Sequence, residues 1–449
     1  MTPSLWSSYR HDHPILTLFV LFVAWKSVII LITLAAPGVG YDTSTSLLDW
    51  EDAGQQTISD TPDHMSNWWM KLVRWDAIYY THLSDQGHIF EQEWAFGIGL
   101  STAISWTSTY LSQLGITGGP SSSLAGIILS HIAHWLSVIQ LWALTESLIG
   151  TDKPTKSLVP LSTAALHIIS PAGVFLSAPS SESAFAFLSM SGFLGYIHAT
   201  HHFHRGQVFA ACTTMISTAM SFSTATIVRS NGVLAGIPFL VEALTTFLVM
   251  FSRGISPSRV TWLASAVAGG LLVAFGMAYP QALAYWEYCH GRDPRDRRPW
   301  CNQSLPSIFT FVQSHYWNVG LFRYWTISNL PLFLLAAPTL SILIYSAVDV
   351  LRRPQLVIRD STPSLSTTVS AGKRALLSLA LPQLMLAVLA LTSYHVQIIT
   401  RLSSGYPLWY IWLAIKLQTK PKRASMVIRW MVIYALVQAG LYASFLPPA

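Results

Sequence analysis

The tripeptide Arg74-Trp75-Asp76 places a guanidinium, an indole ring and a carboxylate in three consecutive residues. A carboxylate can take a proton from a hydroxyl group, and an arginine beside it can hold an anionic group. The tripeptide lies in an acidic segment, residues 37–92, that follows the first long apolar stretch, residues 14–36. We interpret Asp76 as a general base for a lipid-borne substrate. The alternative is a solvated acid beside a tryptophan that anchors the chain to a membrane.

Further polar residues stand at the ends of apolar stretches. Glu182 opens one such stretch, where the alternative interpretation is a carboxylate favoured by a helix dipole. An arginine between two apolar stretches, as at Arg229, is costly unless it is paired or meets a phosphate. Two aromatic clusters lie at residues 315–318 and 323–325. Aromatic residues alone are typical of membrane interfaces, but these two clusters also contain a histidine and an arginine, respectively. The remaining members of the set are Asn231, His315, Tyr316, Trp317, Asn318, Arg323, His395, Gln397, Thr400 and Arg401.

The composition identifies the class of protein that must position these residues. The 449 residues are 52% hydrophobic and 10% charged, and the formal net charge is +6. Soluble proteins contain about 25% charged residues, so this chain cannot cover a soluble surface. We therefore expect an all-α polytopic membrane protein with a single membrane domain over residues 1–449. The bases cluster in short turns without an extended basic patch, which predicts no nucleic-acid partner.

Long apolar stretches give the expected membrane spans. After residues 14–36 they fall at 94–114, 121–149, 158–179, 181–200, 207–228, 231–251, 260–285, 327–349, 375–396, 405–417 and 424–446.

The distribution of charge predicts how the spans are oriented. Residues 37–92 contain nine carboxylates but only Lys71 and Arg74 as strong bases, so this loop should face away from the cytoplasm. Basic turns such as the one at 416–423 should be cytoplasmic, which places residues 286–325 in a second large loop on the side of Asp76. One candidate span must then be re-entrant. We expect it to be 158–179, because Pro171 removes a helix hydrogen bond.

Residues 67–86 are expected to form an amphipathic helix that lies on the membrane surface. Ser66 or Asn67 can cap its start, and Gly87 can close its end. Its apolar stripe consists of Trp68, Leu72, Trp75, Tyr79 and Leu83.

Two of the three cysteines, Cys289 and Cys301, flank an arginine-rich segment of the second loop. We predict a disulfide between them if that side of the membrane is oxidising. The N-x-S/T sequon at Asn302 lies in the same loop. Together these features favour a lumenal position in the endoplasmic reticulum (ER).

Some chemistries lack support in the sequence. It contains no HExxH motif, no metal-ligand spacing of Cys and His, and no glycine-rich phosphate loop, so we expect no metal and no cofactor. Histidines within spans, His131, His134 and His167, keep a membrane-bound acyltransferase open as an alternative. Polar groups at span ends keep a lipid or sugar transporter or flippase open, although no internal repeat is evident.

Taken together, the motifs resemble those of the PIG-V family (GPI mannosyltransferase 2), in the family's order from residue 74 to about residue 410. One departure is Leu332, where the family usually has asparagine. The motifs are Arg74-Trp75-Asp76-Ala77, residues 91–96, residues 170–175 with Ser181-Glu182-Ser183, Arg229-Ser230-Asn231-Gly232, Trp300-Cys301, residues 315–320 with Arg323-Tyr324, and residues 395–401.

This resemblance implies a fold, a reaction and partners. The fold would be a GT-C-type bundle of about 10–12 transmembrane helices whose first lumenal loop carries an interfacial helix. The enzyme would be an inverting α-1,6-mannosyltransferase of the ER membrane with its active site facing the lumen. It would transfer the second mannose from dolichyl phosphate mannose to a GPI precursor lipid. The resemblance leaves open a small accessory membrane subunit.

The residue types suit such a displacement, with Asp76 as the base for the acceptor hydroxyl. Positive groups around the departing phosphate would be Arg229, His315, Arg323 and Arg401. Trp75 and Trp317 could stack on sugars. The other substrate-binding candidates are Arg74, Glu91, Glu93, Glu182, Asn231, Asn318 and Gln397.

Overall fold

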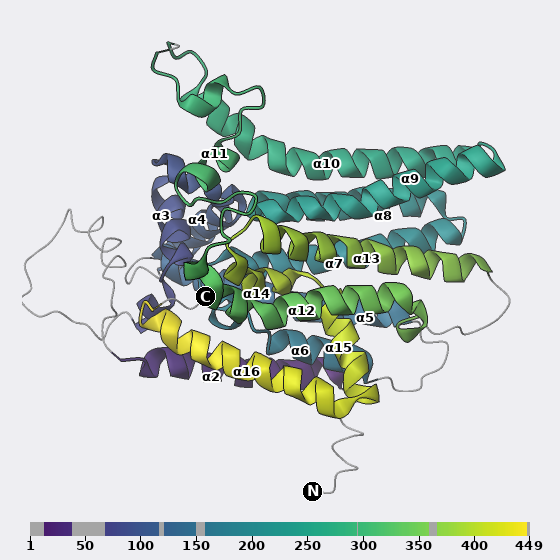
Figure 1. Ribbon diagram of the computed structural model, residues 1–449, viewed down its shortest axis with the longest axis horizontal. Coiled ribbons are helices and arrows are strands. Elements are labelled where there is room, and N and C mark those ends of the chain that lie inside the picture. Colours follow the sequence, from purple (N-terminus) through teal and green to yellow (C-terminus); the bar gives the residue numbers. More distant parts are fainter. Residues whose placement is uncertain are drawn as a thin grey trace, which may run out of the picture.

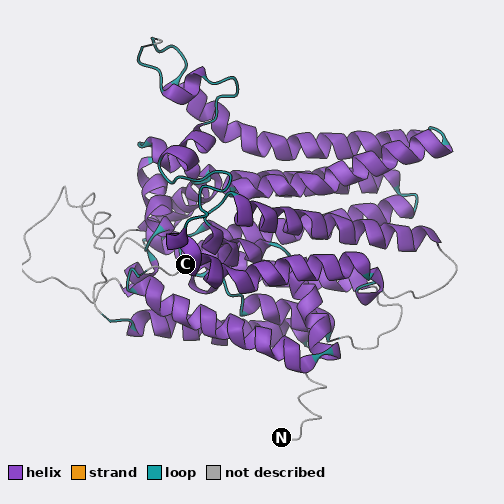
Figure 2. Cartoon of the chain, in the orientation of Figure 1, coloured by secondary structure: helices purple, strands orange, loops and turns teal. Residues whose placement is uncertain are grey.

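The computed structural model describes residues 13–37, 68–115, 121–149, 158–293, 295–358 and 366–446. Within these ranges the chain is all helical and contains no strand (Figure 2). The expected caps at Ser66 and Asn67 lie outside the described residues. Helix labels follow Figure 1.

Eight helical segments in the described residues are long and apolar enough to cross a membrane. The expected all-α polytopic membrane fold is thus confirmed. Figure 1 shows the long helices running side by side along one direction. They are α2 (Pro14–Ala35), α5 (Ser121–Ile149), α8 (Val208–Val228), α9 (Gly236–Arg253, preceded by η6, Ser230–Ala235), α10 (Pro257–Tyr288), α12 (Leu330–Arg352, preceded by η8, Ile327–Asn329), α13 (Ser366–Thr392) and α16 (Pro421–Ala443).

A more polar helix, α7 (Ser181–His204), runs through the interior with two short helices, α6 (Val159–Ile168) and α15 (Leu408–Thr419). Residues 408–414 of α15 are all buried, including Trp409 and Tyr410. A helix that is apolar on all sides is one that its neighbours cover on all sides, and α15 is such a helix. It is buried inside the bundle although it is shorter than a spanning helix. Three short elements precede α15 in the chain. They are η10 (Val396–Ile398), α14 (Ile399–Leu402) and η11 (Ser403–Gly405).

Shorter elements gather at one end of the bundle, which we call the site end (Figure 1). They are η3 (Trp68–Leu72), α3 (Asp76–Gln86), η4 (Glu91–Ala95), α4 (Ile98–Gln113), η5 (Gly173–Leu176), η7 (Pro299–Asn302) and α11 (Ile308–His315).

The expected single helix over 67–86 is wrong. The chain forms η3, breaks at residues 73–75, and starts α3 only at Asp76. The buried Tyr442 hydroxyl lies 3.0 Å from the Leu72 carbonyl oxygen and 2.8 Å from that of Arg74, so these backbone groups are satisfied outside a helix. Gly87 closes α3 as expected, with φ 74°.

Part of the apolar stripe expected on this segment packs against the protein. Leu72 and Leu83 of the apolar stripe are buried against the protein. Trp75 packs into a cluster that contains Ile29 of α2 and Tyr442 of α16. Leu72 and Trp75 therefore dock on the bundle, because α2 and α16 supply an apolar surface there.

The expected re-entrant segment must be reassigned from 158–179 to α4. The far part of α4 meets the start of α5, where the Ser108 and Ser121 hydroxyls lie 2.6 Å apart. That start is itself at the site end, since Ser122 donates to Asp85 of α3 over 2.7 Å. Figure 1 accordingly shows α4 beside α3 rather than along the bundle. Its 16 residues lie across the site end.

Residues 158–180 instead return the chain through the bundle to the site end. Only ten of them form α6, and Pro171 ends the regular structure as expected. The remainder forms η5 and a turn that leads into α7 at Ser181. This irregular backbone is tolerated because it is buried in protein and its groups meet hydroxyls, such as Ser180 donating to the Phe175 carbonyl over 2.5 Å.

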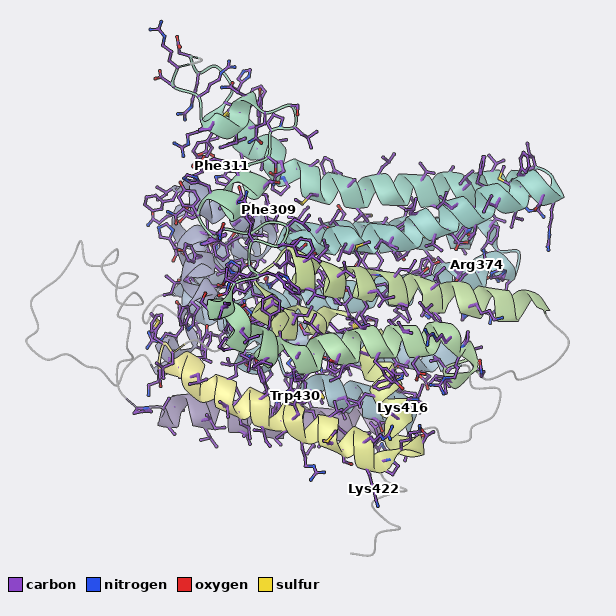
Figure 3. The ribbon with its side chains drawn as sticks, in the orientation of Figure 1. Phe309, Phe311, Arg374, Lys416, Lys422 and Trp430 are labelled. Atoms are coloured by element: carbon purple, nitrogen blue, oxygen red, sulfur yellow. A yellow bond between two sulfur atoms is a disulfide. The ribbon has the colours of Figure 1, made fainter. Side chains whose placement is uncertain are left out.

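The predicted disulfide joins Cys289 and Cys301, which confirms that expectation. It closes the segment after α10 that projects beyond the bundle at the site end (Figure 1). Figure 3 shows Phe309 and Phe311 of this region at the site end, whereas Arg374 and Lys416 lie toward the opposite end.

Candidate active site

Arg401 lies at the centre of a buried charge cluster at the site end. It is 8% exposed and is carried by α14. Its Nε donates to Glu182 Oε1 over 2.7 Å, and its Nη2 lies 2.5 Å from Asp76 Oδ2. One guanidinium therefore joins two carboxylates that are 106 residues apart in the sequence (182 minus 76).

Arg229 approaches the same carboxylate from the end of α8. Its Nη1 donates to Glu182 Oε1 over 2.8 Å and to the Ser181 hydroxyl over 2.7 Å. Oε1 thus receives both arginines, while Oε2 of Glu182 accepts no hydrogen bond from the described residues. The two carboxylates of the cluster balance the charge of the two arginines. Because Glu182 holds both guanidiniums, a phosphate that enters here would meet two cations already in place.

Asp76 is the accessible carboxylate of the cluster. Its side chain is 35% exposed, whereas that of Glu182 is 1% exposed. It is the first residue of α3. Tyr80 follows one turn later on the same face; it is buried, and burial raises its pKa to about 12.

The charge on Arg401 is secured by its neighbours. Burial alone would lower the pKa of Arg401, but the charges of Asp76 and then Glu182, with their hydrogen bonds, outweigh it and raise that pKa. The residue is therefore a permanent cation in contact with the exposed acid. Its role in binding an anion does not depend on pH.

An aromatic platform supports the arginine. The Arg401 guanidinium lies 3.7 Å from the centre of the Phe175 ring, which packs edge-on against Tyr442 at 5.2 Å. The Tyr442 hydroxyl in turn holds the backbone of Arg74, two residues before Asp76. Neither Phe175 nor Tyr442 was predicted from the sequence as a site residue. Phe175 was within a family-like motif, but Tyr442 carried no sequence signal.

Arg74 and Trp75, the two residues before Asp76, are themselves held in place by packing. Arg74 is 6% exposed, and its guanidinium lies 4.5 Å from the centre of the Phe445 ring. Trp75 has φ 55°, a left-handed conformation that is unfavourable for a bulky residue. Trp75 directly precedes α3, whose first residue, Asp76, contacts Arg401.

The structure also places Asn231 near the cluster and gives Glu93 local partners. Asn231, two residues after Arg229, donates to the Tyr406 hydroxyl over 3.2 Å. Glu93 accepts from the backbone amides of Ile89 and Phe90, and lies 2.8 Å from His82. Asn231 therefore braces the arginine's turn, whereas Glu93 braces the loop after α3.

Glu91 joins the disulfide segment to the loop after α3. It accepts hydrogen bonds from Arg298, from Trp300 over 2.8 Å and from Tyr316 over 3.1 Å. Burial would raise the pKa of Glu91, but hydrogen bonds from Arg298 and then Trp300 lower it below its usual value. Its contacts are those of a brace between two loops.

An aromatic row extends outward from α3. Tyr79 stacks on Phe96 at 4.5 Å, and Phe96 meets Trp317 edge-on at 5.9 Å. The Trp317 carbonyl lies 2.8 Å from His395 Nε2, and His395 stacks on Tyr324.

The row continues to Gln397, which accepts from the Tyr324 hydroxyl over 3.0 Å. Asn318, next to Trp317, adopts φ 51°, a conformation that asparagine tolerates. The structure therefore places Trp317, Asn318 and Gln397 in one connected region.

The structure does not bring His315 and Arg323 into the Arg401 cluster. His315 stacks on Phe311 at 4.9 Å and lies edge-on to Tyr316, in the region of Glu91. Arg323 is exposed, and its side chain folds back over Gly320. Of the four phosphate candidates, the structure thus places only Arg229 and Arg401 together.

The intramembrane histidines form a separate interior group. His134 packs between Phe22 and His167, and His167 Nε2 lies 3.1 Å from the Ser404 carbonyl oxygen. Among the described residues no group of three or more His, Cys, Asp or Glu could hold a metal ion.

Comparison with known proteins identifies the family. A model of the mannosyltransferase (PIG-V) family matches residues 15–449. The chain belongs to this mannosyltransferase family. The resemblance of the motifs is thereby confirmed, and the mannosyltransferase is a glycosyltransferase of GPI-anchor biosynthesis.

Curated relatives of this mannosyltransferase match along nearly all of its length. A GPI mannosyltransferase 2 from Aspergillus oryzae is 40% identical over 98% of this chain and 96% of its own. One from Chaetomium globosum is 42% identical over 98% and 97%, respectively. One from Schizosaccharomyces pombe is 31% identical over 84% and 73%.

Among solved structures, the mannosyltransferase is similar to the crystal structure of an oligosaccharyltransferase from Archaeoglobus fulgidus. The TM-score is 0.47 at 11% identity, over 97% of this chain. The match spans 56% of that longer chain.

Proposed function

We propose that this mannosyltransferase moves mannose from dolichyl phosphate mannose to a GPI precursor that already carries one mannose, forming an α-1,6 bond. The observation that carries the proposal is the position of Arg401, in contact with both Asp76 and Glu182. The names of the curated relatives support the acceptor class. The motifs from residue 74 to about residue 410 support the donor.

The reaction is a single displacement at the anomeric carbon. The acceptor hydroxyl oxygen forms the new bond to that carbon, and the bond from the carbon to the phosphate oxygen breaks. The hydroxyl proton goes to Asp76, and dolichyl phosphate leaves with the electron pair. Because the donor mannose is β-linked, one displacement gives the α-linked product.

Accessibility favours Asp76 as the base over the other acids at the site end. Glu182 is buried and already receives two arginines. Glu91 and Glu93 are occupied by local partners. Asp76 has one ion-pair partner among the described residues, and over a third of its side chain is exposed, so a hydroxyl can reach it within hydrogen-bond distance.

Arg229 and Arg401 are the proposed phosphate ligands. Without donor, Arg401 neutralises Asp76; when the phosphate binds, it competes for this guanidinium and frees Asp76 to accept a proton. Glu182 holds both arginines throughout, so they require little reorganisation as charge develops on the leaving group. His315 and Arg323 would then act on more distant parts of the substrates.

The aromatic row is the proposed binding region for sugars. Tyr79 begins the row one turn after Asp76, Trp317 lies within the row with Asn318 beside it, and Gln397 lies at its far end. Aromatic faces suit sugar rings, and the amides of Asn318 and Gln397 can bind hydroxyls. Arg74 and Trp75 contribute by holding Asp76.

We place the site on the lumenal side of the ER membrane. The acidic first loop and the disulfide segment support this orientation. An engineered glycosylation sequon in residues 43–60 should be modified, while one in residues 360–370 should not. Modification of the second site alone would invert the orientation.

The function is tested in cells that lack the protein and are fed labelled mannose. We expect a GPI intermediate with one mannose to accumulate and to disappear when the wild-type chain is restored. Restoring Asp76→Asn instead should leave the intermediate in place. Asp85→Asn is the matched control for that variant, because Asp85 lies on the same helix as Asp76 but contacts Ser122 rather than Arg401. Accumulation of any other intermediate would contradict the proposed step.

A further inference from the structure

Lys26 is a buried lysine in the middle of the first membrane span. It is 5% exposed and belongs to the inward stripe of α2 that also contains Leu18, Phe22, Ile29 and Thr33. A lysine at this depth is costly and needs a partner. Among the described residues no carboxylate forms an ion pair with it, so its charge must be balanced by dipoles.

Two oxygens supply that balance. Lys26 Nζ donates to the Leu176 carbonyl over 2.6 Å and to the Ser177 hydroxyl over 2.8 Å. These groups lie at the end of η5, where carbonyls have no partner within the helix and attract a cation. Lys26 thus fastens the irregular segment before α7 to the first span.

The fastened segment is the one that carries the aromatic platform. Phe175, adjacent to Leu176, lies under the Arg401 guanidinium and against Tyr442. η5 has no long helix to hold it, since Pro171 ends the regular structure before it. Its position depends on the contacts of Lys26 and on hydroxyls such as Ser183, which donates to the same Leu176 carbonyl over 3.0 Å.

We propose that Lys26 is a positioning residue for the reaction: by holding the end of η5 it keeps Phe175 under Arg401, and so keeps Arg401 between Asp76 and Glu182. Lys26 touches neither carboxylate and acts through Phe175. This inference rests on the proposed role of Arg401 in catalysis. It predicts that a contact inside the membrane controls the rate of a step at its surface.

The test is the steady-state activity of Lys26→Met, which keeps most of the side-chain length but removes the donor. We expect kcat per folded enzyme to fall roughly 10- to 100-fold, as for a small misplacement of a catalytic group. The apparent KM for the acceptor should change little, because Lys26 contacts no substrate. Lys26→Arg, which retains donors, should recover part of the lost kcat.

Lys416→Met is the matched control. Lys416 is also a buried lysine of a helix, but it pairs with Asp349, at 2.9 Å, toward the opposite end of the bundle. Its loss should lower the amount of folded enzyme and leave kcat unchanged. If Lys26→Met behaves in the same way, Lys26 is only a structural anchor and the proposal is overturned.

A double variant shows whether the effect passes through Phe175. Phe175→Leu should lower kcat by itself, and Lys26→Met should add little to it, because both act on the same contact. Independent, multiplying losses would overturn the proposed route. If Lys26→Met does not accumulate, Ser177→Ala removes one of its acceptors, and a normal kcat in that variant would also overturn the proposal.

The outcome is separable from that of the proposed function. Full activity of Asp76→Asn would remove the proposed base but leave a kcat effect of Lys26 intact. Normal kcat in Lys26→Met, with Asp76→Asn inactive, would remove only the positioning role.

Discussion

Two buried glutamates, each 1% exposed, lie in different parts of the bundle and are used differently. Glu242 of α9 accepts from Trp262 and Arg374 through one oxygen and from Tyr196 through the other. Glu182 receives both of its arginines on one oxygen and leaves the other without a partner in the described structure.

The arginines that bind these two glutamates also have different further partners. Arg374 continues to the exposed ring of His204, 2.8 Å away, and both oxygens of Glu242 have partners within the protein. Arg401 continues to Asp76, a partly exposed acid. Both networks contain buried charge that must be paired to be tolerated. A network in which every group is paired holds helices together, whereas one that ends in an exposed acid can exchange a partner with a ligand.

The largest difference between the two networks should appear when their arginines are replaced. Arg401→Lys keeps the charge but cannot span both carboxylates, so we expect a loss of kcat of roughly 10²-fold or more. Arg374→Lys should keep kcat and reduce only the yield of folded protein. The assay is mannose transfer by membranes normalised for enzyme content. Equal losses in both variants would erase the distinction between the two networks.

The glutamates offer a sharper version of the same comparison. Glu182→Gln preserves shape but weakens the hold on Arg229 and Arg401, and hydrogen bonds between charged groups contribute about 1.5–3 kcal/mol. We expect kcat to fall roughly tenfold or more. Glu242→Gln should instead lower the midpoint of thermal unfolding with kcat preserved. Activity of Glu182→Gln equal to wild type would contradict the phosphate-site role.

The disulfide should contribute to stability with little effect on the chemical step. Cys289→Ser with Cys301→Ser opens a loop of twelve residues' separation, which costs about 3 kcal/mol in the chain-entropy model. We expect a lower midpoint of thermal unfolding and a kcat within a few-fold of wild type. Thiol labelling with and without reductant checks the bond; two freely reactive thiols in the native enzyme would refute it.

The smallest expected effect is a pH dependence of stability at His88. This ring packs on Trp94 at 4.2 Å, and burial lowers its pKa to about 4 from 6.5. The unfolded chain therefore takes up a proton below about pH 6.5 while the folded protein does not. Stability should fall as the pH drops from about 6.5 toward 4, and His88→Phe should flatten that slope in thermal unfolding.

Among the described residues, eight of the twelve expected spans overlap helices that are long and apolar enough to cross a membrane, because each of these is a local run of apolar residues. The sequence could not predict the break at residues 73–75, because the hydroxyl that satisfies that backbone belongs to Tyr442, more than 360 residues away. The same limit led to the assignment of 158–179, rather than α4, as re-entrant: α4 is apolar like a span, and only its contacts place it across the site end.

The site was predictable by residue type but not by arrangement. Asp76 was a candidate as the carboxylate of the Arg74-Trp75-Asp76 tripeptide. Glu182, Arg229 and Arg401 were candidates because each is a charge at the end of an apolar stretch. Their pairing required tertiary contacts, and the same contacts separated His315 and Arg323 from them. Lys26 lies within an apolar stretch and was not among the predicted site residues.

The central claim is that Asp76 takes the proton of the acceptor hydroxyl. The most direct test is transfer of mannose to the one-mannose GPI intermediate by membranes that contain equal amounts of wild-type, Asp76→Asn or Asp85→Asn enzyme. We predict that Asp76→Asn slows the chemical step roughly 10²- to 10⁴-fold at unchanged abundance, while Asp85→Asn stays near wild type. Near-normal transfer by Asp76→Asn would contradict the account.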